Sequence, residues 1–162
     1  MKDENRKWWT LGAVACGLFM IMLDNTVVNV SLPAMQASLG LEISELEWIV
    51  TGYALSFGAL MLTGGKLADL FGRRRVFVAG IAVFTLASLW CGLAASAGAL
   101  IGARIVQGVG AALMNPATLS IIMVTFEPRE RGRAIGIWVG VSAVALAVGP
   151  LIGGLITELV GW

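Results

Sequence analysis

Five long stretches that are almost free of charge, separated by short charged segments, constrain what this chain can fold into. Four of them contain no Asp, Glu, Lys or Arg: residues 48–65, 76–103, 105–126 and 134–157. The remaining stretch, residues 8–32, contains one charge, Asp24. Hydrophobic residues make up 58% of the chain and charged residues only 13%, so little polar surface could cover a soluble core. We therefore predict an all-α integral membrane protein.

A helix crosses the hydrocarbon core of a bilayer with about 20 apolar residues. Residues 76–126 are too long for one crossing, although only Arg104 interrupts them, and are assigned to two helices. Pro33 is expected to end the first helix, because its ring cannot continue the hydrogen-bond ladder. Turns are expected over residues 95–98 and 127–128. The pattern predicts one partial bundle over residues 1–162 with five helices at about 8–32, 47–67, 76–94, 99–124 and 134–159.

Basic residues gather in alternate connections of this predicted bundle. Ten of the eleven lie before the first helix, between the second and third, or between the fourth and fifth: Lys2, Arg6, Lys7, Lys66, Arg73, Arg74, Arg75, Arg129, Arg131 and Arg133. The opposite connections carry only acidic charges. The positive-inside rule predicts a multi-pass protein of the cell membrane with a cytoplasmic N-terminus. A cleaved signal peptide is disfavoured, because the first apolar run is too long and four more spans follow.

Asp24 is a carboxylate at membrane depth. Such a group costs about 2.5–3.5 kcal/mol on insertion scales, so it normally faces a bundle interior or an aqueous cavity. Burial disfavours the charged form of a carboxyl group, which makes Asp24 a candidate for carrying a proton from one side to the other. Its polar neighbours are Asn25, Thr26, Asn29 and Ser31. The alternative is a carboxylate near the outer interface that only hydrogen-bonds to these neighbours.

Arg104 is the second charge within a span. It shares one helical face with Gln107, Gly108 and Ala111, by their spacing of three, four and seven residues. A buried guanidinium needs acceptors, which could be backbone carbonyls, a carboxylate or a substrate. The alternative is an arginine that snorkels to the outer interface from the start of the fourth helix.

The connection between the second and third helices has the sequence GKLADLFGRRR over residues 65–75. We expect Gly65 to let helices approach and Gly72 to permit a left-handed turn. Asp69 can accept hydrogen bonds from helix N-terminal amides or from an arginine such as Arg73. The arginines could also serve only to set the topology.

The fifth helix repeats small residues with a spacing of four. These are Gly132, Gly136 and Gly140, followed by Gly149 and Gly153. This spacing gives a flat face for close helix contact, and Pro150 favours a kink. Packing alone and a role as a gate or hinge both remain open. Cys16 and Cys91, on different predicted helices, are interpreted as small packing residues rather than as a disulfide or metal ligands.

Four segments of the chain resemble, in order, motifs of the major facilitator superfamily, in its branch of fourteen-helix drug:proton antiporters. They are LDNTVVNVSLP at 23–33, GKLADLFGRRR at 65–75, RIVQGVG at 104–110 and GPLIGG at 149–154. Leu70 stands where the family often has arginine, which leaves one charge contact of the loop in doubt. Ser31 stands where alanine is common.

The resemblance implies a role for each motif. Asp24 and Arg104 would take part in proton coupling. The loop motif would stabilise an outward-facing state through Gly65, Asp69, Gly72 and Arg73. The fourth-helix motif would comprise Arg104, Gln107, Gly108 and Gly110. The antiporter motif of the fifth helix would comprise Gly149, Pro150, Gly153 and Gly154.

The resemblance further implies proton-coupled efflux of hydrophobic or cationic drugs, with no cofactor, no metal and no nucleic acid involved. A complete member has two six-helix bundles, so this chain would supply five of the first six helices and need the missing C-terminal helices. One alternative is a metabolite or sugar carrier of the same superfamily. Another is a non-transporting, truncated membrane protein that associates with a carrier. An intramembrane enzyme is disfavoured by the lack of histidine, of paired intramembrane carboxylates and of a nucleophile motif.

Overall fold

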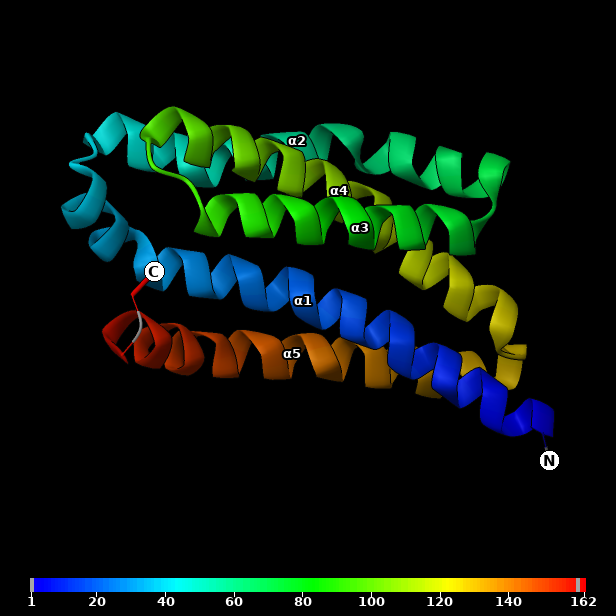
Figure 1. Cartoon of the computed structure of the whole chain (residues 1–162). Helices are drawn as coiled ribbons and strands as arrows, with labels where there is room; N and C mark the ends of the chain where they lie inside the picture. Colours follow the sequence, from blue (N-terminus) through cyan, green and yellow to red (C-terminus); the bar gives the residue numbers. More distant parts are fainter. Residues whose placement is uncertain (1, 160) are drawn as a thin grey trace.

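The computed structural model describes residues 2–159 and 161–162 of the chain. Within them the backbone forms five α-helices and no strand (Figure 1). The helices are α1 (Lys2–Leu39), α2 (Ile43–Phe71), α3 (Arg73–Gly92), α4 (Ala97–Thr125) and α5 (Pro128–Leu159). All five are long and apolar enough to cross a membrane, as the uncharged stretches predict.

The prediction that Pro33 ends the first helix is wrong. Pro33 lies inside α1, which continues to Leu39. A proline removes one backbone donor, and membrane helices tolerate this because nearby polar groups and small local adjustments satisfy the freed carbonyl. Figure 1 shows α1 changing direction in its last turns before α2 begins. The helix ends at Gly40, which has a φ of 64°, and the Leu41 amide donates to the Gln36 carbonyl at 3.2 Å, as in a Schellman cap.

Two of the other connections, α2–α3 and α4–α5, are shorter than the sequence predicts, and the α3–α4 connection has the predicted length but begins two residues earlier. Gly72 alone separates α2 from α3. Its backbone φ is 95°, a value that residues other than glycine rarely adopt. Residues 93–96 join α3 to α4, where the Ser96 hydroxyl caps α4 by accepting from the Ala99 amide. Pro128 belongs to α5 rather than to a turn, because the first residue of a helix needs no amide hydrogen.

The helices alternate in direction, so the connections gather at two ends. Figure 1 shows the N-terminus, the α2–α3 connection and the α4–α5 connection at one end, and the other connections and the C-terminus at the opposite end. All the basic residues except Arg104 lie at or near the helix ends of the first of these groups, so they gather toward one end of the bundle, as their order in the sequence predicts.

Helix α4 occupies the centre of the structure. It packs closely against α2 and α3 and also contacts α1, which in turn packs along α5. Many large apolar side chains on the outside are exposed, among them Leu62, Leu89 and Leu155. In water these side chains would weaken the fold, whereas acyl chains solvate them.

Glycines let α4 approach its neighbours backbone to backbone. A Cβ on Gly110 would lie 2.6 Å from the Phe84 amide nitrogen of α3, and a Cβ on Gly64 of α2 would overlap the Ala112 carbonyl oxygen. Close approach of this kind drives helix association in lipid, where van der Waals contact replaces the hydrophobic effect between helices.

The basic end of α1 is held to the start of α5 by several contacts. The Lys7 ammonium donates to the Glu130 carboxylate at 2.6 Å. The Trp8 ring meets the Phe126 ring edge to face, with centroids 5.3 Å apart, and the Arg133 guanidinium lies 5.0 Å from the Trp8 ring centroid. These contacts fix the position of α1 beside α5.

We expect Gly110→Ala to lower the thermal unfolding midpoint of the detergent-solubilised protein by several degrees. Its added methyl group must displace the Phe84 backbone, and overpacking of this kind typically costs about 1–3 kcal/mol. The matched control is Gly58→Ala on α2, where nothing in the described residues lies within 4 Å of the new methyl group. The control should unfold at the parent temperature or slightly above it, since alanine favours a helix. Equal stability of the two variants would contradict the packing assigned to α4.

Candidate functional site

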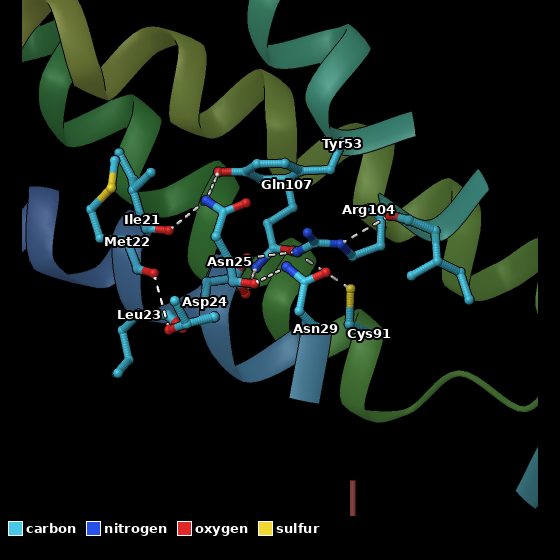
Figure 2. Close-up of polar contacts among 12 residues, drawn as sticks. Ile21, Met22, Leu23, Asp24, Asn25, Asn29, Tyr53, Cys91, Arg104 and Gln107 are labelled. Atoms are coloured by element: carbon cyan, nitrogen blue, oxygen red, sulfur yellow. Dashed lines mark hydrogen bonds and ion pairs between the residues drawn. The ribbon is translucent and has the colours of Figure 1, made fainter. Parts of the chain in front are cut away.

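The two charges within the spans form an ion pair. The Arg104 Nη1 atom of α4 donates to the Asp24 Oδ2 atom of α1 at 2.6 Å (Figure 2). The Arg104 side chain is 3% exposed and the Asp24 side chain 14%. Asp24 therefore does more than hydrogen-bond to its polar neighbours on α1, and the Arg104 guanidinium is buried against α1 rather than extended to an interface. The pair joins helices that are 80 residues apart in sequence.

Gln107 completes the pair as a third member. Its Nε2 atom donates to Asp24 Oδ1 at 2.7 Å, and its Oε1 atom accepts from Arg104 Nη1 at 2.5 Å. The amide NH₂ group thus contacts the negative charge, and the amide oxygen contacts the positive charge. Arg104 and Gln107 lie three residues apart on one face of α4, as their spacing predicts.

Arg104 has two further contacts, both from α2. Its Nε atom donates to the Ile49 carbonyl at 3.4 Å. Its guanidinium lies over the face of the Tyr53 ring, 4.2 Å from the centroid, within the range of a cation–π interaction. Of the acceptors that the sequence left open for this arginine, a carboxylate and a backbone carbonyl are both present.

The polar neighbours of Asp24 along α1 divide into two groups. Asn25 donates to the Tyr53 hydroxyl at 3.3 Å, and the Ser31 hydroxyl lies 2.9 Å from that of Thr157 on α5. Thr26 and Asn29 bond to backbone carbonyls of α1 itself. Asn25 and Ser31 thus connect α1 to other helices, and Ser31 uses the hydroxyl that distinguishes it from the alanine common in the resembling family.

The ion pair lies where two apolar clusters meet. One cluster contains Ile21 and Tyr53, and the other contains Ile49 and Leu100. Tyr53 of the first cluster and the Ile49 backbone of the second both contact Arg104. A site of low polarity strengthens the attraction between the paired charges.

The glycines of the fourth- and fifth-helix motifs bring backbones to this site. A Cβ on Gly108 would overlap Ser56 and would lie 2.6 Å from the Tyr53 carbonyl oxygen. A Cβ on Gly149 would overlap Thr26. A Cβ on Gly153 would lie 3.1 Å from the Val27 Cα atom. These motifs therefore seat α2 on α4, and α5 on α1, within one turn of the ion pair.

Other small residues of the fifth helix do not share this role. Within the described part of the chain, nothing lies within 4 Å of a Cβ placed on Gly132, Gly136, Gly140 or Gly154. Pro150 lies inside α5 and is exposed. The four-residue spacing therefore marks a packed face only at Gly149 and Gly153.

The loop motif lies at the basic end of the bundle and does not join the ion pair. Arg73 donates to Asp69 at 3.5 Å; the Arg73 side chain is about one third exposed and the Asp69 side chain is largely exposed. Gly65 was expected to let helices approach, but the close contact between α2 and α4 is made by its neighbour Gly64. A Cβ on Gly65 would lie 3.6 Å from Pro116, which is an ordinary van der Waals distance. The register of the helix face places Gly64, rather than Gly65, against α4.

Sequence reasoning missed two members of the site. Tyr53 is the single tyrosine of the chain, and an isolated polar aromatic residue in an apolar span was the available signal. Cys91, interpreted as a packing residue, donates to Gln107 Oε1 at 3.8 Å. Together with Asp24, Tyr53 and Arg104 it makes the site a meeting point of α1, α2, α3 and α4.

Asp24 also borders a cavity of about 210 Å³ that is lined by residues of α1, α3, α4 and α5. Polar side chains in its wall include Ser31, Ser88, Cys91 and Thr157. The carboxylate is thus in contact with a space that small polar species could enter. In the described residues no group of His, Cys, Asp and Glu side chains is placed to hold a metal ion.

The comparison with protein families agrees with the four motifs. The model described as Major Facilitator Superfamily matches residues 14–162. The chain belongs to this superfamily. The superfamily consists of transporters rather than enzymes.

Relatives of this Major Facilitator Superfamily chain are named for drug resistance or export. It is 48% identical over 160 residues to puromycin resistance protein pur8 of Streptomyces alboniger, covering 98% of this chain and 32% of that protein. It is 43% identical to the tetracenomycin C resistance and export protein of Streptomyces glaucescens, covering 98% and 30%. It is 42% identical to multidrug resistance protein Stp of Mycobacterium tuberculosis, covering 94% and 29%. The chain thus spans about a third of the length of these relatives.

A double-mutant cycle tests whether the ion pair acts as a unit. We expect Asp24→Asn and Arg104→Gln each to destabilise the protein by about 3–5 kcal/mol, because each leaves the other charge buried without its partner. The double variant should lose at least about 1 kcal/mol less than the sum of the two. Unfolding in mixed detergent micelles measures all three values. Strictly additive losses would contradict the pairing.

Proposed function

We propose that this chain forms part of the N-terminal bundle of a proton-coupled exporter of hydrophobic or cationic drugs. The observation that carries the proposal is the buried Asp24–Arg104 pair between α1 and α4. The names of the relatives, which concern resistance to antibiotics and their export, support the direction of transport. The substrate pocket and the drug itself would involve helices beyond this chain.

Asp24 is the proton carrier in this proposal. When it is ionised, it pairs with Arg104 and accepts from Gln107. When it takes up a proton, its attraction for Arg104 is lost and the contact between α1 and α4 weakens. Proton uptake and drug binding would then favour different arrangements of the helices, so that proton entry drives drug release.

The membrane supplies enough energy for this exchange. Moving one elementary charge through 100 mV is worth about 2.3 kcal/mol. That is a shift of roughly fiftyfold in a two-state equilibrium, which suffices to bias alternating access between inward and outward forms.

The remaining motifs would support the same cycle. The exposed Asp69–Arg73 contact beside Gly72 is placed to latch the α2–α3 connection, and we propose that it stabilises the outward-facing form. The tight seating of Gly149 and Gly153 on α1 would transmit movement of α5 to the turn that carries Asp24.

We further propose that the protein lies in the bacterial plasma membrane with its N-terminus in the cytoplasm. The end that carries the N-terminus and the α2–α3 and α4–α5 connections also carries ten of the eleven basic residues. The positive-inside rule assigns such an end to the cytoplasm.

Asp24→Asn should abolish proton-driven export in the full-length transporter. The amide keeps the size of the side chain but cannot carry a proton. The measurement is uptake of ethidium and of puromycin into everted membrane vesicles energised by a pH gradient with an acidic lumen, because eversion turns export into uptake. Glu47→Gln, which removes an exposed carboxylate on α2, is the matched control and should transport like the parent. Undiminished pH-driven uptake by Asp24→Asn would refute the proposal.

Cysteine labelling tests the orientation. A membrane-impermeant maleimide added to intact cells should label Ser44→Cys, in the exposed first turn of α2. It should label Arg129→Cys, in the exposed first turn of α5, only after the cells are permeabilised. The unsubstituted protein, with Cys16 and Cys91, gives the background. The reverse pattern would place the N-terminus outside.

A further inference from the structure

Proton uptake by Asp24 leaves the Arg104 guanidinium without its negatively charged partner. An arginine in a protein keeps its charge, and an unpaired charge in a buried site is strongly destabilising. The Arg104 side chain is 3% exposed, so water cannot replace the lost carboxylate. A proton carrier of this design therefore needs a second partner that holds the guanidinium while Asp24 is neutral.

Three contacts of Arg104 would survive neutralisation of Asp24. Two are hydrogen bonds to neutral oxygens, on Gln107 and on the Ile49 backbone. The third is the face of the Tyr53 ring, 4.2 Å from the guanidinium carbon. A ring face attracts a bare cation more strongly than one already paired with an anion, because its quadrupole acts on the net charge.

The Tyr53 ring is fixed in the orientation that this role requires. Its hydroxyl accepts from Asn25 at 3.3 Å (Figure 2). The Phe57 ring stacks beside it at 6.1 Å with an interplanar angle of 16°. The backbone at Tyr53 sits directly on Gly108, one turn after Arg104 on the same face of α4. The ring is almost fully buried, so the whole arrangement is preorganised.

We propose that Tyr53 is a positioning residue that holds the Arg104 cation in place while Asp24 carries a proton. This inference rests on the proposed proton-coupled export. It assigns the contact between the Tyr53 ring and Arg104 to the state in which Asp24 is protonated. By stabilising the lone cation, the ring makes proton uptake by Asp24 easier. The hydroxyl contributes through Asn25 only to the orientation of the ring.

Among the described residues, three other ionisable groups lie around Asp24. The Arg104 guanidinium of α4 contacts it directly, and the Tyr53 hydroxyl of α2 and the Cys91 thiol of α3 contact its neighbours Asn25 and Gln107. Helix α5 presents Gly149, Gly153 and the uncharged Thr157 to this part of α1. A change in the pH dependence of transport on altering the ring would therefore report on the Arg104–Asp24 pair.

The decisive variants change the electrostatics of the ring and keep its shape. Tyr53→Phe retains the ring face and loses the hydroxyl. Tyr53→pentafluorophenylalanine, introduced by stop-codon suppression, has nearly the same shape but a depleted ring face. Tyr53→Met removes the ring and fills the space with a flexible side chain. The readout is ethidium and puromycin transport into everted vesicles of the full-length protein, at a series of lumenal pH values.

Tyr53→Phe should reach half-maximal transport at a lumenal proton concentration within about twofold of the one that the parent needs. The fluorinated variant and Tyr53→Met should need a roughly tenfold higher lumenal proton concentration, with near-parental transport at saturating acid. A rate that falls equally at all pH values, with the parental midpoint, would overturn the inference and leave Tyr53 a packing residue. Asp24→Asn run in parallel separates the two claims: if it transports normally, the proposed function itself fails, whatever the Tyr53 variants do.

Discussion

The ion pair between Asp24 and Arg104 is the interaction on which the rest of the structure depends. Placing either charge alone at membrane depth is costly, and the cost is offset only while the two are held together with their remaining hydrogen-bonding groups satisfied. Gln107 and the Ile49 carbonyl supply those bonds, and Tyr53 covers the guanidinium face. The helices α1, α2 and α4 must therefore keep a fixed register, because a shift of one residue would remove these partners. A structure whose stability depends on a proton-binding group is already sensitive to proton uptake.

Small residues make that register possible. In lipid the hydrophobic effect does not drive helices together, so close van der Waals contact must hold them together. Gly108 admits the backbone of α2 beside Arg104, while Gly110, two residues later, admits the backbone of α3 on another face of α4. On the opposite side of α1, Gly149 and Gly153 admit the turn that carries Asp24. The fourth- and fifth-helix motifs are thus packing devices that position two charges. Their chemical and structural roles cannot be separated.

Much of this could be read from the sequence, because membrane insertion leaves a strong signal. The uncharged stretches gave the five helices, and the high cost of a buried charge singled out Asp24 and Arg104. Other features depend on tertiary contacts that a single sequence does not display. Pro33 resembles a helix end, but in a membrane bundle one missing backbone bond is tolerated, and α1 continues to Leu39. The Tyr53 ring lies over the guanidinium because Gly108 lets the α2 backbone approach α4. Helix ends, ring stacking and the choice between adjacent glycines follow from register, which hydropathy does not specify.

The central claim is that Asp24 changes its ionisation while the protein works. Infrared difference spectroscopy of the full-length transporter in lipid, recorded as the pH is lowered, observes this directly. A carbonyl stretch of a protonated carboxyl group should appear on acidification, vanish when drug is added, and be missing in Asp24→Asn. A spectrum with no protonated carboxyl at any pH, or one with the same band in the absence of the Asp24 carboxyl group, would contradict the account.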